Sequence, residues 1–303
     1  MQRADIQRKG IGVMEIGHVG AGTFAGIIFS LCISIALPVV LLIVVHKKTK
    51  ARMAMAVIGA ATFFLFAMVL EQILHAVVLG VGGERITGNI WIYGLYGGLA
   101  AGLFEEVGRF VAMRFAMKKQ LNLPNALMYG VGHGGIEAIL IVGLASVSNL
   151  VTSIMINAGT LEASLGALDQ ATKEATLTQL SALWTTPSYQ FFLSGIERIV
   201  AVTLHIALSV LVFQAVKLGK KRYWFLAFAI HAGVDFVTVV AANYLNLVLV
   251  EVMLAVLVAG VVVLTVSLCR RNWDVVGFEV EAEAPVVDEA DANQRERNDF
   301  GGV

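Results

Sequence analysis

Long apolar runs separated by short polar connections are the main pattern along this chain. Seven stretches of mainly apolar residues can be marked, and a run of about 20 such residues crosses a hydrocarbon core of roughly 30 Å as a helix. The pattern therefore predicts an all-α integral membrane protein, a bundle of about seven transmembrane helices. The predicted spans are 20–45, 53–80, 90–117, 125–150, 189–216, 224–244 and 247–268.

Composition supports a membrane location. Of the 303 residues, 58% are hydrophobic and 15% are charged, and the mean hydropathy is +0.80, whereas soluble domains carry about 25% charged residues. The apolar composition implies membrane lipid as a partner. The 22 basic residues balance the 22 acidic ones, so net charge implies neither nucleic acid nor an acidic partner. Cys32 and Cys269 both lie in apolar runs, which argues against a disulfide framework or a cysteine metal site.

The placement of basic residues predicts the orientation of the chain in the cell membrane. Basic connections follow the first, third, fifth and seventh spans, whereas the connections after the other spans carry Arg85 and Lys173 only. Because basic residues are retained in the cytoplasm, the N-terminus is predicted to lie outside and the C-terminus in the cytoplasm. The basic connections carry Lys47, Lys48, Lys50, Arg52, Lys118, Lys119, Lys217, Lys220, Lys221, Arg222, Arg270 and Arg271.

Three parts of the chain are expected. They are an N-terminal segment 1–19, a transmembrane domain 20–272, and an acidic, solvated cytoplasmic tail 273–303. The long non-cytoplasmic connection 151–187 includes a helix-forming stretch, 169–184. That stretch is either an interfacial helix or lid along the membrane surface, or an ordinary surface helix.

Ionisable residues cluster within four of the predicted spans, where each is costly and therefore points to a functional site. Residues four apart share a helical face, which places His133 with Glu137 and His231 with Asp235. The clustered residues are Glu105, Glu106 and Arg109 in FEEVGRF, His133 and Glu137 in GVGHGGIEAI, His205 with the neighbouring Glu197 and Arg198, and His231 and Asp235 in HAGVD.

Depth in the membrane brings these groups together. At 1.5 Å per residue, the groups on all four helices lie roughly 10–20 Å from the cytoplasmic ends. We therefore predict one polar cavity inside the bundle, open to water from one side. By residue count, Glu197 and Arg198 lie nearer the outer end of their span, and they are assigned a structural role. Glu71, His75 and Glu251 are placed outside the site.

This set of residues suits the activation of a water molecule. A glutamate, Glu105 or Glu106, is the expected general base, and Arg109 is expected to pair with the other one. Histidines either ligate a metal or stabilise an oxyanion, and zinc is the natural metal for imidazole and carboxylate donors. The predicted catalytic residues are Glu105, Glu106, Arg109, His133, Glu137 and Asp235, and the predicted metal ligands are His133, Glu137, His205 and His231.

The same motifs carry a family resemblance. FEEVGRF, GVGHGGIEAI, ERIVAVTLH and HAGVD resemble the YhfC family of intramembrane proteases and, more distantly, the PrsW and CAAX prenyl proteases. The resemblance covers residues 103–243 and implies hydrolysis of a peptide or membrane-protein substrate in or near the membrane. It implies a catalytic glutamate at Glu105 or Glu106, with His133, His205, His231 and Asp235 in the site.

The sequence leaves the substrate, the use of a metal and the class of function open. The EExxR spacing is closer to that of PrsW than to the CAAX pattern, so a prenylated substrate is not predicted, and the relatives differ over whether a metal is used. Taken alone, the two glutamates and Arg109 would also fit a structural ion pair. A proton-coupled transporter or channel is the alternative function, because buried carboxylates and histidines also form proton relays.

Overall fold

The computed structural model describes residues 16–276 and shows an all-α membrane protein, with no strand among the described residues. The predicted segments 1–19 and 273–303 fall mostly outside this range. The helices are α1 (Ala21–Thr49), α2 (Met53–Phe63), η2 (Phe64–Glu71), α3 (Gln72–Thr87), α4 (Ile90–Val111), η3 (Ala112–Ala116), η4 (Lys118–Gln120), α5 (Leu123–Ala138), η5 (Ile139–Gly143), α6 (Leu144–Asn157), α7 (Leu161–Ser164), α8 (Gln170–Leu180), α9 (Ala182–Thr185), α10 (Tyr189–Leu218), α11 (Arg222–Tyr244), α12 (Leu247–Arg271) and α13 (Trp273–Val276).

Six helical stretches of the described chain are long and apolar enough to cross a membrane. Five of the predicted spans correspond to α1, α10, α11, α12 and the stretch from α2 to α3; the sixth, from α5 to α6, runs to Asn157 because the π-helical segment η5 does not end it. The remaining predicted span, 90–117, corresponds to α4, which is not among the six. That helix carries Glu105, Glu106 and Arg109.

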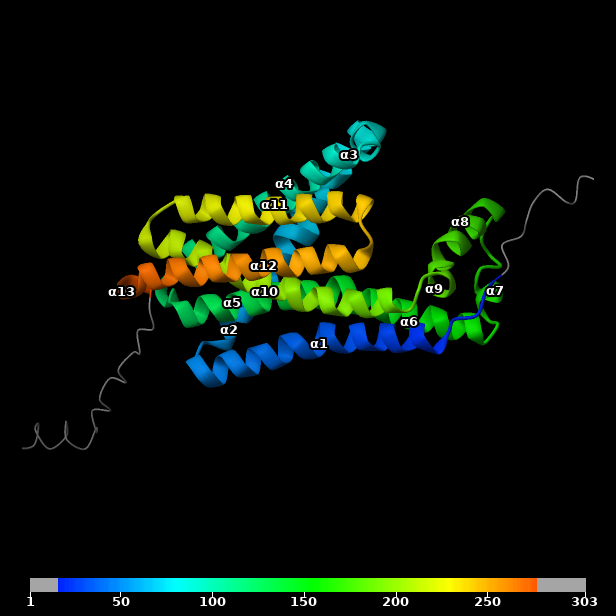
Figure 1. The fold of residues 1–303 in the computed structure, drawn as a ribbon, viewed down its shortest axis with the longest axis horizontal. Coiled ribbons are helices and arrows are strands. Elements are labelled where there is room, and N and C mark those ends of the chain that lie inside the picture. The colour runs from blue at the N-terminus through cyan, green and yellow to red at the C-terminus, as the bar shows by residue number, and fades with distance from the viewer. Residues whose placement is uncertain (1–15, 277–303) are drawn as a thin grey trace, which may run out of the picture.

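Helix α10 is the centre of the bundle. In its most apolar stretch 67% of residues are buried, against 22–33% in the other five apolar spans. It packs against α1, α5, α11 and α12, while α4 packs mainly on α11. Helices α1, α5, α10, α11 and α12 run along the long axis of the molecule, and α4 and α3 are inclined to them (Figure 1).

The two ends of the bundle differ. The basic connections all emerge at one end, called here the basic end, where α13 also lies (Figure 1). At the opposite end α7, α8 and α9 form a small lobe with its own apolar contacts, including Leu161, Leu177 and Leu183. Leu177 and Leu180 are the only large apolar residues of α8, so this helix has no broad apolar face for the membrane and has the character of a surface helix.

Glycines set the closest helix contacts. A Cβ added at Gly98 of α4 would lie 2.4 Å from the carbonyl oxygen of Ala232 on α11, and one at Gly132 of α5 would lie 2.0 Å from that of Ala56 on α2. Small residues of this kind let membrane helices approach closely. Consequently α4 and α11 are near enough for their polar side chains to meet.

We expect Gly98→Ala to lower the free energy of unfolding by about 1–3 kcal/mol, because the added methyl group would clash with the backbone of Ala232 and push α4 away from α11. Gly97→Ala is the matched control, since a Cβ there meets nothing within 4 Å, and alanine favours a helix over glycine. Thermal unfolding of both purified variants is the measurement. Equal shifts in the two variants would contradict the packing argument.

Candidate active site

The ionisable residues of four helices meet inside the bundle. Helix α4 supplies Glu105, Glu106 and Arg109, and the other residues come from α5, α10 and α11. The side chains of Glu106 and Arg109 are completely buried. The remaining members are His133 and Glu137 on α5, His205 on α10, and His231 and Asp235 on α11.

Arg109 links the two glutamates of its own helix. Its Nη1 donates to Glu106 Oε1, and its Nη2 lies 3.3 Å from Glu105 Oε2. Spacings of three and four residues place all three side chains on one face of α4. Because an unpaired charge buried in a membrane is costly, this pairing stabilises the cluster.

Two histidines are each held by a carboxylate on one ring nitrogen. His231 Nδ1 lies 2.8 Å from Glu106 Oε1, and His205 Nε2 contacts Glu137 Oε2. The other ring nitrogens face Glu105, with His205 Nδ1 3.7 Å and His231 Nε2 3.9 Å from its oxygens. A carboxylate on the far nitrogen fixes the tautomer and raises the basicity of the near one, as behind metal-bound histidines.

His133 holds Glu105 from the α5 side. Its Nε2 lies 2.8 Å from Glu105 Oε2, and the rings of Phe63 and Tyr129 pack 5.3 Å and 6.0 Å from its own. The buried Nδ1 atom has no hydrogen-bond partner among the described residues. The imidazole is thus fixed in place with one nitrogen on Glu105.

A cavity of about 290 Å³ adjoins the cluster. Asp235 lies at its wall, with Oδ2 3.6 Å from His231 Nε2 and 34% of its side chain exposed. Arg198 Nη1 donates to Glu137 Oε1 at 2.8 Å and also pairs with Glu197. The lining includes Gly97, Gly98, Glu105, Glu137, Glu197, Arg198, His205, His231, Val234, Asp235, Thr238, Leu254 and Val258.

Three donors in this cluster suit a metal ion. One ligand atom each from Glu105, His205 and His231 lies within 4.8 Å of the other two, the one such group within residues 16–276. Two imidazoles and a carboxylate are a donor set of catalytic zinc sites, so these residues fit a metal. Arg109 Nη2 lies 2.5 Å from His205 Nδ1, so the guanidinium competes with a cation for this atom.

The structure brings the predicted site residues together, but their contacts suggest other roles than those predicted. Glu105, expected as a base, belongs to the three-donor group, whereas His133 and Glu137, expected as ligands, lie outside it and contact Glu105 and His205. Glu106 does not line the cavity. Glu197 and Arg198, which were assigned a structural role near the outer end, both line the cavity, where Arg198 pairs with Glu137 and with Glu197.

Two neighbours of the site were not singled out from the sequence. The indole N–H of Trp224 donates to the backbone oxygen of Glu106 at 2.9 Å, and Tyr129 packs on His133. Helical spacing could have identified both residues. Trp224 precedes His231 by two helical turns and Tyr129 precedes His133 by one, so each lies on the same helical face as its histidine.

Known proteins give two matches. The sequence model of a family described as YhfC intramembrane metalloprotease matches residues 33–259. A protein of Bacillus subtilis (strain 168) named "Uncharacterized membrane protein YhfC" is 42% identical over 203 residues, which are 66% of this chain and 78% of the relative. No solved structure matches.

We expect Arg109→Met to lower the free energy of unfolding by about 3–5 kcal/mol, because it leaves two buried carboxylates without their cation. The double variant Arg109→Met/Glu106→Gln removes one of those charges and should recover part of the loss. Arg85→Met is the control, since Arg85 is exposed. The comparison is made by unfolding the purified variants, and no recovery in the double variant would contradict the pairing.

Proposed function

We propose that this chain, which belongs to the YhfC intramembrane metalloprotease family, hydrolyses a peptide bond in or beside the membrane at the cluster around Glu105. One observation carries the proposal. The carboxylate of Glu105 faces the ring nitrogens of His205 and His231, whose other nitrogens are held by Glu137 and Glu106. That is the arrangement of a catalytic metal site with its supporting carboxylates.

Glu105, His205 and His231 would hold the metal, and zinc suits this donor set. When bound, the ion makes water acidic enough to ionise near neutral pH and polarises the scissile carbonyl. The supporting residues keep the ligands oriented. Glu106 accepts from His231, and His133 positions Glu105.

Asp235 is the proposed general base. It is a cavity-lining carboxylate with a partly exposed side chain close to His231 Nε2. It can accept a proton from the attacking water and return it to the leaving amine. Glu106 cannot take this role, because its carboxylate is completely buried and bound to Arg109 and His231.

The cavity sets the direction from which water and substrate arrive. It extends from Glu105 to Thr238 and Glu197, and Thr238 lies about 10 Å beyond His231 along α11, away from the basic end. We assign the basic end to the cytoplasm by the distribution of lysines and arginines. The site then opens toward the outside, and membrane-embedded or membrane-proximal segments of other proteins are the proposed substrates.

Packing beyond the cluster closes the cavity on one side. Toward the basic end the next residues form a close apolar core in which Met113, Tyr129, Leu208 and Leu211 are 0% exposed. A transporter needs a path that reaches both faces in turn. A cavity that ends on the histidines suits a reaction site.

The activity test compares membrane proteins incubated with purified wild type or with variants reconstituted in liposomes. New N-termini produced by the wild type are identified by mass spectrometry. Glu105→Gln and Asp235→Asn should reduce their formation by about 10²-fold or more, while His18→Ala, an exposed residue outside the cluster, should leave it unchanged. Cleavage that persists in both carboxylate variants would refute the proposed roles.

Metal content gives an independent test. Wild-type protein loaded with zinc and freed of excess metal should retain about one ion per chain. His205→Ala and His231→Ala should each lose most of it, because each removes a donor, whereas His18→Ala should keep it. Elemental analysis of the folded variants is the measurement. Zinc retention equal to that of the wild type in His205→Ala and His231→Ala would exclude this ligand set.

A further inference from the structure

A second cavity lies on the other side of α10 from the cluster. This rear groove, formed between α1, α5, α10 and α12, has a volume of about 520 Å³. Its walls are mainly aliphatic side chains from all four helices. They include Leu37, Leu127, Ile206, Ala207, Val262 and Val266.

Helix α10 separates the two cavities. Arg198 and His205 face the cavity of the active site, whereas Ile199, Thr203 and Ile206 face the rear groove. The rear groove therefore holds none of the ionisable groups of the proposed reaction. Its contents would touch the back of the helix that carries a proposed metal ligand.

The dimensions of the rear groove fit one leaflet of a bilayer. Along α10 it is lined from Ile199 to Val210, about 16 Å at 1.5 Å per residue. Half of a hydrocarbon core is roughly 15 Å. An extended acyl chain from the leaflet at the basic end would thus lie along the groove.

Charge is confined to one end of the rear groove. Its lining includes Arg270 and Trp273, at the basic end, and no acidic residue. Among residues 16–276 no carboxylate lies within ion-pair distance of Arg270, and Asp274 is the nearest acidic residue in sequence. Arg270 thus offers a cation at the depth where lipid headgroups lie.

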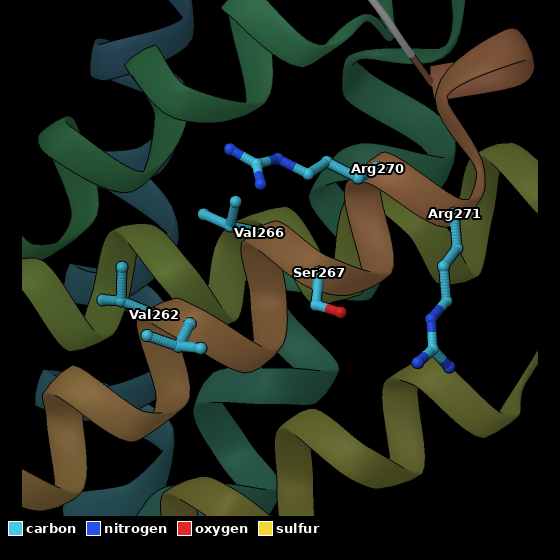
Figure 2. Close-up of a pocket in the computed structure, with 6 residues that line it drawn as sticks. Val262, Val266, Ser267, Arg270 and Arg271 are labelled. Atoms are coloured by element: carbon cyan, nitrogen blue, oxygen red, sulfur yellow. The ribbon is translucent and has the colours of Figure 1, made fainter.

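Arg270 and Arg271 provide an internal comparison. Figure 2 shows them leaving α12 in different directions, with Arg270 on the side of Val266. Arg270 and Val266 both line the rear groove, and Arg271 does not. Both arginines line the adjoining cavity drawn in Figure 2, together with Val262 and Val266, but of the two Arg270 alone also lines the rear groove.

We propose that the rear groove binds an anionic phospholipid of the leaflet at the basic end. One acyl chain lies between α1, α10 and α12, and the headgroup phosphate pairs with Arg270. Anionic headgroups suit this end, because the connections around it are basic and attract negative lipid. An arginine fork pairs with phosphate through two hydrogen bonds.

The test is native mass spectrometry of the purified full-length chain with phosphatidylglycerol or phosphatidylcholine. Wild type should bind phosphatidylglycerol more tightly, and Arg270→Ala should weaken that binding about fivefold, while Arg271→Ala changes it less than twofold. Thr203→Phe should weaken binding of both lipids by filling the groove. Val256→Phe is its control, since Val256 is 67% exposed and lies outside the groove.

Each result bears on the proposal. Equal losses in Arg270→Ala and Arg271→Ala would show general attraction to a basic surface and overturn it. Equal behaviour of Thr203→Phe and Val256→Phe would show that no chain enters the groove and would also overturn it. Displacement of the lipid by glycerol phosphate at matched concentration would mean a headgroup site without a chain, and would reject the proposal as well.

Discussion

The pairing of Arg109 with Glu105 and Glu106 is the interaction on which the centre of the bundle depends. Three charges on one helix face inside the membrane are tolerable only when their hydrogen-bonding capacity is met. Arg109 meets part of it within α4, and the imidazoles of neighbouring helices meet much of the rest. The requirement to satisfy these charges therefore fixes which faces of α5, α10 and α11 turn inward.

Close packing makes this satisfaction possible. Imidazole and carboxylate side chains are short, so helices at ordinary distances would leave them apart. Gly98 against Ala232 brings α4 to α11, and Gly132 against Ala56 brings α5 to α2. The hydrogen bond between His231 and Glu106 follows from the first of these contacts. Stability and the proposed chemistry thus share the same small residues.

The sequence predicted much of this arrangement. Apolar runs located the spans, and helical spacing with depth placed the charged residues at one level, because both depend on repeats within a single helix. Partners across helices depend on rotation about each axis, which these repeats do not define. The sequence therefore left the base open between Glu105 and Glu106 and assigned His133 as a ligand, whereas in the structure Glu105 faces His205 and His231, and His133 contacts Glu105 from α5. The rear groove is formed by side chains from four helices, so no pattern within a single helix predicts it.

The polarity of α4 has a consequence for how the protein is made. Each charge at the centre of a helix costs roughly 2.5–3.5 kcal/mol on insertion scales, and α4 lies outside the six helices apolar enough to cross a membrane by composition. Its main packing partner, α11, is synthesised only after α5 to α10. Helix α4 therefore carries its charges without the packing of α11 until the last third of the chain has been synthesised.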